Sequence, residues 1–193
     1  MIPEIIFFTL LSVIILFIRK KKLDFSSINL EIKCYQFLII AAIIEITADF
    51  LFHNYFSTDL LKILSFHWLI YFAIFIVTIL NFKRPFMKLL FFGTLFNFIA
   101  IVSNDFKMPV LVSEVLTDVE AKKLYLHTGQ DLIHSLLTED TKFKILCDII
   151  TLAPPYLFPK TISIGDVFLL LGVFTVWQEQ PDDKKMTDCP NSF

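Results

Sequence analysis

The sequence predicts an all-α fold, a polytopic membrane helix bundle of about five spans with a small helical outer subdomain between the last two. Hydrophobic residues make up 56% of the 193 positions, including 23 phenylalanines. The mean hydropathy is +0.70. Both values are too apolar for an ordinary soluble domain, in which about 45–50% of residues are apolar. The lipid bilayer is therefore the first expected partner.

Apolar runs define the expected spans at 5–18, 34–52, 63–80, 89–103 and 164–177. A straight span needs about 17–25 residues, so the first, fourth and fifth runs must recruit flanking residues or lie in a thinned bilayer. The chain is therefore expected to form one domain with four parts. Residues 1–103 form a four-helix membrane region, 104–163 an outer segment, 164–178 the final membrane helix and 179–193 a cytoplasmic tail.

Basic residues predict the orientation. The cluster at 19–22 follows the first apolar run, which indicates a retained helix rather than a cleaved secretory signal. Together with Lys83, Arg84 and Lys88, this cluster is expected on the cytoplasmic side by the positive-inside rule. The N-terminus is then outside and the C-terminus cytoplasmic.

The outer segment contains two expected helices. Thr117 and Glu120 have the spacing of a capping box and predict a helix start. Leucine and isoleucine then recur at helical spacing, at 132, 133, 136 and 137, and predict a second helix. Prolines at 154, 155 and 159 end this pattern, so the chain is expected to loop along the headgroups before the final span.

Several function classes are excluded by composition. A net charge of −2 without a basic stripe gives no footprint for nucleic acid. The three cysteines lack C-x-x-C spacing, and no H-E-x-x-H occurs, so no metal site is expected. Four glycines in all leave no Gly-rich phosphate loop and no G-x-S-x-G elbow. No cofactor is expected.

Three ionisable residues share one face of the second span. Glu45, Asp49 and His53 lie at i, i+4 and i+8. A charge at mid-span costs about 2.5–3.5 kcal/mol, so Glu45 must be paired, protonated or beside water. The face predicts handling of an ion or small ligand. Asp49 and His53 approach the outer end, where solvation alone accounts for them equally well.

Two acids, Asp148 and Asp166, flank the Pro-rich segment at 154–159. Two carboxylates within about 3–5 Å cannot both ionise comfortably, so one would hold a proton and the pair could perform acid–base hydrolysis. Gly165 would let a substrate backbone approach. In the structural alternative, Asp166 is an N-cap or first-turn acid of the last helix, and Ser163 is an equally good N-cap.

The stretches "SNDFKMPV" (103–110), "TEDTKFKILCDII" (138–150) and "SIGDVFLLLG" (163–172) occur in that order. Together they resemble an uncharacterised bacterial family of small multi-pass membrane proteins, a domain of unknown function, over residues 89–178. The resemblance implies the bacterial cytoplasmic membrane but no activity. Asn104, in the N-x-x-x-M-P-V motif, is a candidate supporting residue. The chain departs from the family pattern at Asp105 and Cys147, where glycine is commoner.

A more distant similarity suggests chemistry. Asp148 in "LCDII" and Asp166 in "SIGDV" resemble the two catalytic acids of lipoprotein signal peptidase, with Ser163 in place of an Asn and Gly165 in place of an Ala. The asparagine-rich neighbourhood of that peptidase is not reproduced, and residues 108–144 have no counterpart in it. The similarity implies an aspartyl intramembrane peptidase-like hydrolase acting on a membrane-associated peptide or lipopeptide.

Three hypotheses stay open. The peptidase hypothesis predicts that Asp148 and Asp166 meet beneath the Pro-rich loop. A non-catalytic membrane protein that binds a partner through its outer segment predicts separate, individually capped acids. An ion-handling or small-ligand subunit predicts a polar path through Glu45 and Asp49. The sequence names neither a substrate nor an oligomeric state.

Overall fold

A computed structural model describes residues 2–19, 32–55, 67–116, 119–127, 131 and 133–178. Within these ranges the chain is mostly helical. The helices are α1 (Ile2–Ile18), α2 (Gln36–Tyr55), α4 (His67–Leu80), α5 (Pro85–Ser103), α6 (Val119–His127) and α7 (Ile164–Gln178). The short strands are β1 (Met108–Val110), β2 (His134–Leu136), β3 (Ile150–Leu152) and β4 (Lys160–Ile162), with a 3₁₀ turn η1 (Lys144–Leu146).

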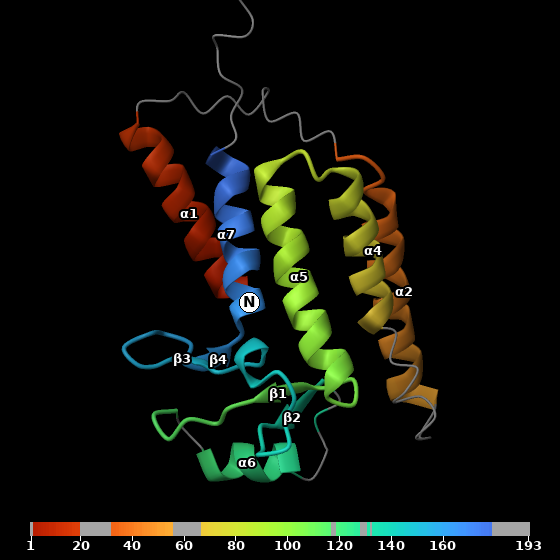
Figure 1. Ribbon diagram of the computed structural model, residues 1–193, viewed down its shortest axis with the longest axis vertical. Coiled ribbons are helices and arrows are strands. Elements are labelled where there is room, and N and C mark those ends of the chain that lie inside the picture. Colours follow the sequence, from red (N-terminus) through yellow and green to blue (C-terminus); the bar gives the residue numbers. More distant parts are fainter. Residues whose placement is uncertain are drawn as a thin grey trace, which may run out of the picture.

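The five long helices stand in a row (Figure 1). Helix α7 packs between α1 and α5, and α4 packs between α5 and α2. The strands and α6 gather at one end of the row, beside the start of α1, the end of α5 and the start of α7 (Figure 1). The end of α1 and the α4–α5 turn lie at the opposite end, so Arg19 and Arg84 lie away from the strands.

The long helices differ in whether they are long enough to cross a membrane. Among the described residues, α5, with 19 residues, is the one helix both long and apolar enough to cross a bilayer. Helix α1, the 70–80 part of α4, and α7 are apolar but shorter. Five helices occur where five spans are expected, yet their lengths alone do not establish a five-span bundle.

Helices α5 and α7 approach each other closely through glycine. A Cβ atom on Gly165 would collide with Oδ1 of Asn97 and lie 2.6 Å from the backbone oxygen of Gly93. A Cβ on Gly93 would lie 2.7 Å from the backbone oxygen of Gly165. Backbone cannot move aside as a flexible side chain can, so small residues set the separation of these helices. Gly165 thus serves helix packing, while its expected role in admitting a substrate backbone stays a prediction.

The α4–α5 interface is built from aromatic rings instead. Phe75 lies 5.7 Å from Phe91 and 5.5 Å from Phe98 between ring centroids, and both contacts are edge-on. Tyr71 and Phe72 also contact Phe98. Edge-to-face pairs of this kind each contribute about 0.5–1.5 kcal/mol beyond their buried area. This side of α5 is stabilised by dispersion and ring electrostatics.

The outer subdomain, which is expected to be helical, contains strands as well as a helix. One helix, α6, begins at Val119 close to the predicted start; Thr117 and Asp118 of the capping box lie outside the described residues. The second expected helix is replaced by β2, which pairs in parallel with β1, Met108 opposite His134. This segment therefore contains a β1–β2 pair and an antiparallel β3–β4 hairpin in addition to α6 and η1.

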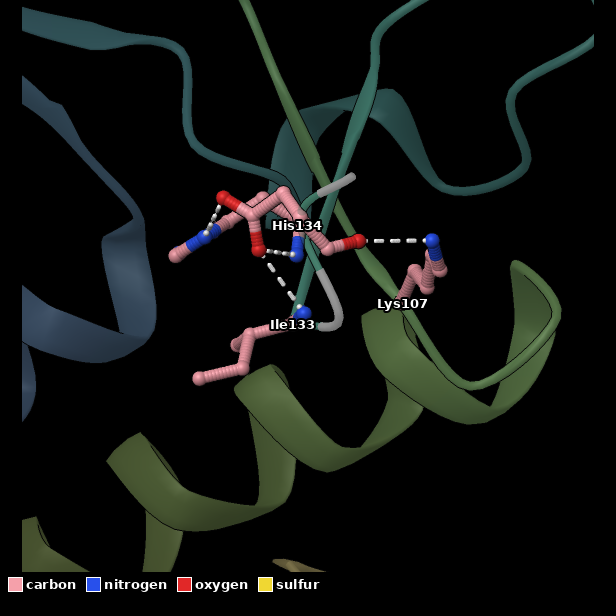
Figure 2. A network of polar contacts seen from close by, with 4 residues as sticks. Lys107, Ile133 and His134 are labelled. Atoms are coloured by element: carbon pink, nitrogen blue, oxygen red, sulfur yellow. Dashed lines mark hydrogen bonds and ion pairs between the residues drawn. The ribbon is translucent and has the colours of Figure 1, made fainter. Parts of the chain in front are cut away.

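The reason for β2 lies in Asp131 and the edge of β1. The Asp131 carboxylate accepts the backbone N–H groups of Ile133, at 2.8 Å, and His134, at 2.9 Å (Figure 2). Its other oxygen lies 3.0 Å from Nδ1 of His134, and Lys107 Nζ donates to the Asp131 carbonyl at 2.7 Å. These contacts fix an extended chain beside β1. These hydrogen bonds determine the local backbone conformation more strongly than the helical spacing of four apolar residues does.

Candidate functional site

The β3–β4 hairpin brings Asp148 and Asp166 to the same end of α7. Ile150 is paired with Ile162, and Leu152 with Lys160. Asp148 precedes β3 by two residues, and Asp166 lies in the first turn of α7, which starts just after β4. The backbone of Asp148 is fixed against β1, since its N–H donates to Pro109 O at 3.0 Å and its carbonyl accepts from Leu111 N at 2.8 Å. The two acids therefore flank the base of one hairpin.

Asp166 caps the helix that carries it. Its backbone N–H donates to Oγ of Ser163 at 2.9 Å, and its Oδ2 accepts from the Ser163 backbone N at 3.4 Å. This reciprocal pair is a capping box that satisfies donors at the start of α7. The capping expected in the structural alternative is thus present.

Asn97 of α5 orients both capping residues. Its Nδ2 donates to Asp166 Oδ1 at 2.9 Å, and its Oδ1 accepts from Ser163 Oγ at 2.7 Å. The sequence reasoning missed Asn97. An amide inside the apolar helix α5 was the available signal, since a buried polar group in such a helix needs a partner.

Asp148 is the more deeply buried of the two acids. It is 7% exposed, and no hydrogen-bond partner of its Oδ1 occurs within the described ranges. Burial first, and the charge of Asp166 second, raise the pKa of Asp148 to about 7, while Lys122 and Lys160 oppose the rise. Burial, and then the charge of Asp148, raise the pKa of the adjacent Cys147 thiol to about 11. Asp148 can therefore hold a proton near neutral pH.

The two carboxyls interact through their charges, while no hydrogen bond between them occurs in the part of the chain that the structure describes. Asp166 has both oxygens engaged by Asn97 and Ser163, whereas Asp148 keeps an oxygen without a partner. The arrangement is asymmetric. One acid is oriented and hydrogen-bonded, and the other is buried and easily protonated.

A second polar cluster lies next to this pair. Lys160 of β4 forms an ion pair with Glu4 of α1, Nζ to Oε2 at 2.7 Å, and the Tyr156 hydroxyl donates to Glu4 Oε1 at 2.5 Å. The hydrogen bond to Glu4 raises the pKa of Tyr156 to about 12. The charge of Lys160 also acts on both Asp148 and Asp166. The sequence reasoning missed this cluster, although an acid in an apolar N-terminal run was visible.

The remaining sequence candidates lie elsewhere. Asn104 fastens the outer segment to the end of α5: its Nδ2 donates to Ala100 O at 2.7 Å and Lys142 O at 3.0 Å, and its Oδ1 accepts from Lys142 N at 2.9 Å. Glu45, Asp49 and His53 are on α2, which packs against α4, and their side chains lie outside the described parts. The ion-handling path stays a prediction.

The fold and the site thus define a mostly helical protein with an asymmetric carboxyl pair at one end of its helix row. The chain belongs to a family of unknown function, DUF5317, which matches residues 29–178. Helix α1, with Glu4, lies outside the matched range. A search of curated proteins and a search of solved structures each found no match.

Proposed function

We propose that this protein is a multi-pass protein of the bacterial cytoplasmic membrane, with its N-terminus outside and its C-terminus cytoplasmic. Apolar helices and large exposed apolar side chains support a lipid environment; on α1, Phe7 is 60% exposed and Leu10 56%. The positive-inside rule supports the orientation, because the end of α1 and the α4–α5 turn lie opposite the strands (Figure 1). Arg19 directly follows α1, and Arg84 is in the α4–α5 turn.

Within this framework, the carboxyl pair is the centre of an aspartyl hydrolase acting on a membrane-associated peptide or lipopeptide at the outer face. The observation that carries this proposal is the buried Asp148 carboxyl, with one unpartnered oxygen and a pKa raised to about 7 by burial and by Asp166. Pairs of carboxyls with different environments are typical of acid and base roles in catalysis.

The chemistry assigns one role to each acid. Asp166, oriented by Asn97, acts as the base and accepts a proton from a water. The water oxygen bonds to the carbonyl carbon of the scissile peptide, while protonated Asp148 donates to the carbonyl oxygen. When the C–N bond breaks, the leaving amine takes up the proton that Asp166 received, and the former carbonyl oxygen returns its proton to Asp148. The products are a carboxylic acid and an amine, and no cofactor is needed.

A second candidate is favoured by the engagement of Asp166. Both of its oxygens accept hydrogen bonds from Asn97 and Ser163, which is sufficient to explain its presence as a helix cap. In this alternative the protein is non-catalytic and binds a partner through its outer segment. Asp148 would then be a buried group of the β1 edge without a chemical role.

An inhibitor-binding experiment separates the two candidates. Purified full-length protein in lipid nanodiscs is melted with and without a pepstatin-type or globomycin-type inhibitor. The hydrolase proposal predicts a higher melting temperature with inhibitor for the wild type and for Asp140→Asn, an exposed acid in the same segment. Asp148→Asn and Asp166→Asn are expected to lose the shift. No shift in the wild type, or an undiminished shift in Asp148→Asn, contradicts the hydrolase.

The pH dependence of stability tests the state of Asp148 independently of activity. Its pKa is raised from 3.8 to about 7 in the folded chain, so the folded state binds this proton more tightly than the unfolded state. Ionisation therefore destabilises the fold as the pH rises between these values. The penalty is absent below the lower value, complete above the higher one, and at most about 4 kcal/mol.

Asp148→Asn removes this penalty. The variant is expected to melt at a higher temperature than the wild type at pH 8 and at nearly the same temperature at pH 4, as measured in detergent micelles. Asp140→Asn is the control and should change little at either pH. Equal melting of Asp148→Asn and wild type at pH 8 would show that Asp148 is not destabilised by ionisation.

A further inference from the structure

The tip of the β3–β4 hairpin, residues 153–159, exposes apolar side chains. Leu157 is 79% exposed and Phe158 51%. The seven residues read "APPYLFP" and contain no charged group; the first cation after them is Lys160. Exposed apolar residues occur singly on most proteins, but an uncharged tip with adjacent leucine and phenylalanine is typical of a segment that contacts an apolar environment.

The hairpin tip is fixed against the first turn of α1. The Tyr156 hydroxyl and Lys160 Nζ both bind the carboxylate of Glu4, which is 4% exposed. The Tyr156 ring contacts the Phe158 ring edge-on, with 6.4 Å between centroids. One contact from within the tip and one from the residue that follows it therefore hold the tip at the level of Glu4, and Figure 1 shows the hairpin beside the start of α1.

The first turn of α1 is itself apolar toward the surroundings. Ile2 is exposed and Ile6 is more than half exposed, next to the buried Glu4. In the proposed orientation this turn lies at the outer membrane surface. A tip held at the same level would then contact the boundary between headgroups and acyl chains, where tyrosine, with its apolar ring and polar hydroxyl, is favourable.

We propose that the hairpin tip inserts Leu157 and Phe158 into the outer leaflet of the membrane that holds the helices. The occupant of this surface is lipid, because the tip is uncharged and is fastened to an apolar helix end. The ion pair and hydrogen bond to Glu4 set its depth. Helices α1 and α7 are apolar but shorter than the helix that is long enough to cross a membrane. Insertion of the tip gives the chain an additional anchor in the bilayer.

The inference rests on the proposed function and narrows its substrate class. Strand β3 leads from Asp148 to the tip, and β4 leads from the tip back to Asp166. A lipid-inserted tip therefore places the two acids at the base of a hairpin that faces the acyl chains. A peptide carrying its own lipid anchor is the substrate that reaches the pair from this side.

Depth-dependent fluorescence quenching tests the insertion. Trp68 and Trp177 are first replaced by phenylalanine in the full-length protein, and a single tryptophan is introduced by Leu157→Trp. The protein is reconstituted into phosphatidylcholine–phosphatidylglycerol vesicles containing lipid brominated near the headgroup end of its acyl chains. The expected result is a loss of fluorescence comparable to that of Phe7→Trp, an exposed position on α1. Phe158→Trp, an aromatic exchange at the tip, is the second variant.

Matched controls separate the possible outcomes. Leu124→Trp, at a position 64% exposed on α6, is expected to be quenched by aqueous acrylamide and not by bromolipid. If the tip tryptophans behave as Leu124→Trp does while Phe7→Trp is quenched by bromolipid, the insertion is overturned and the membrane placement stands. Protection from both quenchers shows a protein covering the tip and also overturns insertion. If Phe7→Trp escapes bromolipid, the membrane placement fails and the inference with it. If the tip inserts into lipid but the protein is not a hydrolase, only the inhibitor experiment shows it.

Discussion

The two sides of α5 are stabilised by different chemistry. Toward α7, the interface combines the close approach of Gly93 and Gly165 with the hydrogen bonds of Asn97 to Ser163 and Asp166. Toward α4, phenylalanine rings pack edge-on around Phe75 and Phe98. Hydrogen bonds and backbone contacts fix position and angle, whereas ring contacts tolerate small displacements. The side that positions the carboxyl pair is thus the side with the stricter geometry.

The largest effect is expected when the close approach itself is broken. Gly165→Ala forces the added Cβ onto Asn97 and onto the backbone of Gly93, so α5 and α7 must separate. We expect a loss of about 2–3 kcal/mol, seen as a lower melting temperature in detergent. Gly172→Ala is the control. Its added Cβ meets the end of the Leu90 side chain at 2.8 Å, which can rotate away, so a loss below about 1 kcal/mol is expected. Equal losses would contradict the assigned difference.

A medium effect is expected from the hydrogen bonds across the same interface. Asn97→Ala leaves Ser163 Oγ and Asp166 Oδ1 without their α5 partner, at a cost of about 1–2 kcal/mol. In a double-mutant cycle with Ser163→Ala, the two losses should be clearly less than additive, because both changes remove the same hydrogen bond. Additive losses would show that Asn97 and Ser163 act independently.

The smallest effect is expected on the aromatic side. Phe75→Leu removes edge-on contacts with Phe91 and Phe98 while retaining an apolar side chain, at a cost of about 1 kcal/mol. The pH dependence of stability that Asp148 produces should be unchanged, because the α5–α7 side is untouched. A change in that pH profile would mean that the two sides of α5 are coupled.

The family region covers only part of the chain. The match over residues 29–178 includes α5, α7, the hairpin and both acids, but not α1. Glu4 nevertheless contributes the carboxylate that binds Lys160 and Tyr156. Part of the surroundings of the carboxyl pair therefore comes from a helix outside the family region.

Local patterns predicted the helices well. Helix α5 ends at Ser103 and α7 begins at Ile164, both as the apolar runs predicted, and α6 begins within the capping-box sequence. Ser163 and Asp166 form the cap that their spacing allowed. Such features depend on residues within one turn of each other, which a linear sequence displays directly.

Hydrogen bonds between residues far apart in the sequence could not be predicted from such local patterns. The hydrogen bond of Asn97 to Asp166 joins residues 69 apart, and that of Tyr156 to Glu4 joins residues 152 apart. Strands of three residues, such as β2, carry too little periodicity to be recognised, and they form because Asp131 and β1 supply partners. No spacing rule relates such residues before the chain is folded.

By itself, the sequence determined that most of the chain is helical, where the five apolar helices lie to within a few residues, and that Asp166 lies near the start of the last one. Only the tertiary structure decided that Asp148 and Asp166 sense each other's charge, that Gly165 belongs to helix packing, and that Glu4 holds the hairpin. The physical reason is the range of the forces involved. Helix formation follows from neighbouring residues, whereas burial, the pKa of Asp148 and the contacts of the hairpin arise only when distant segments exclude water together.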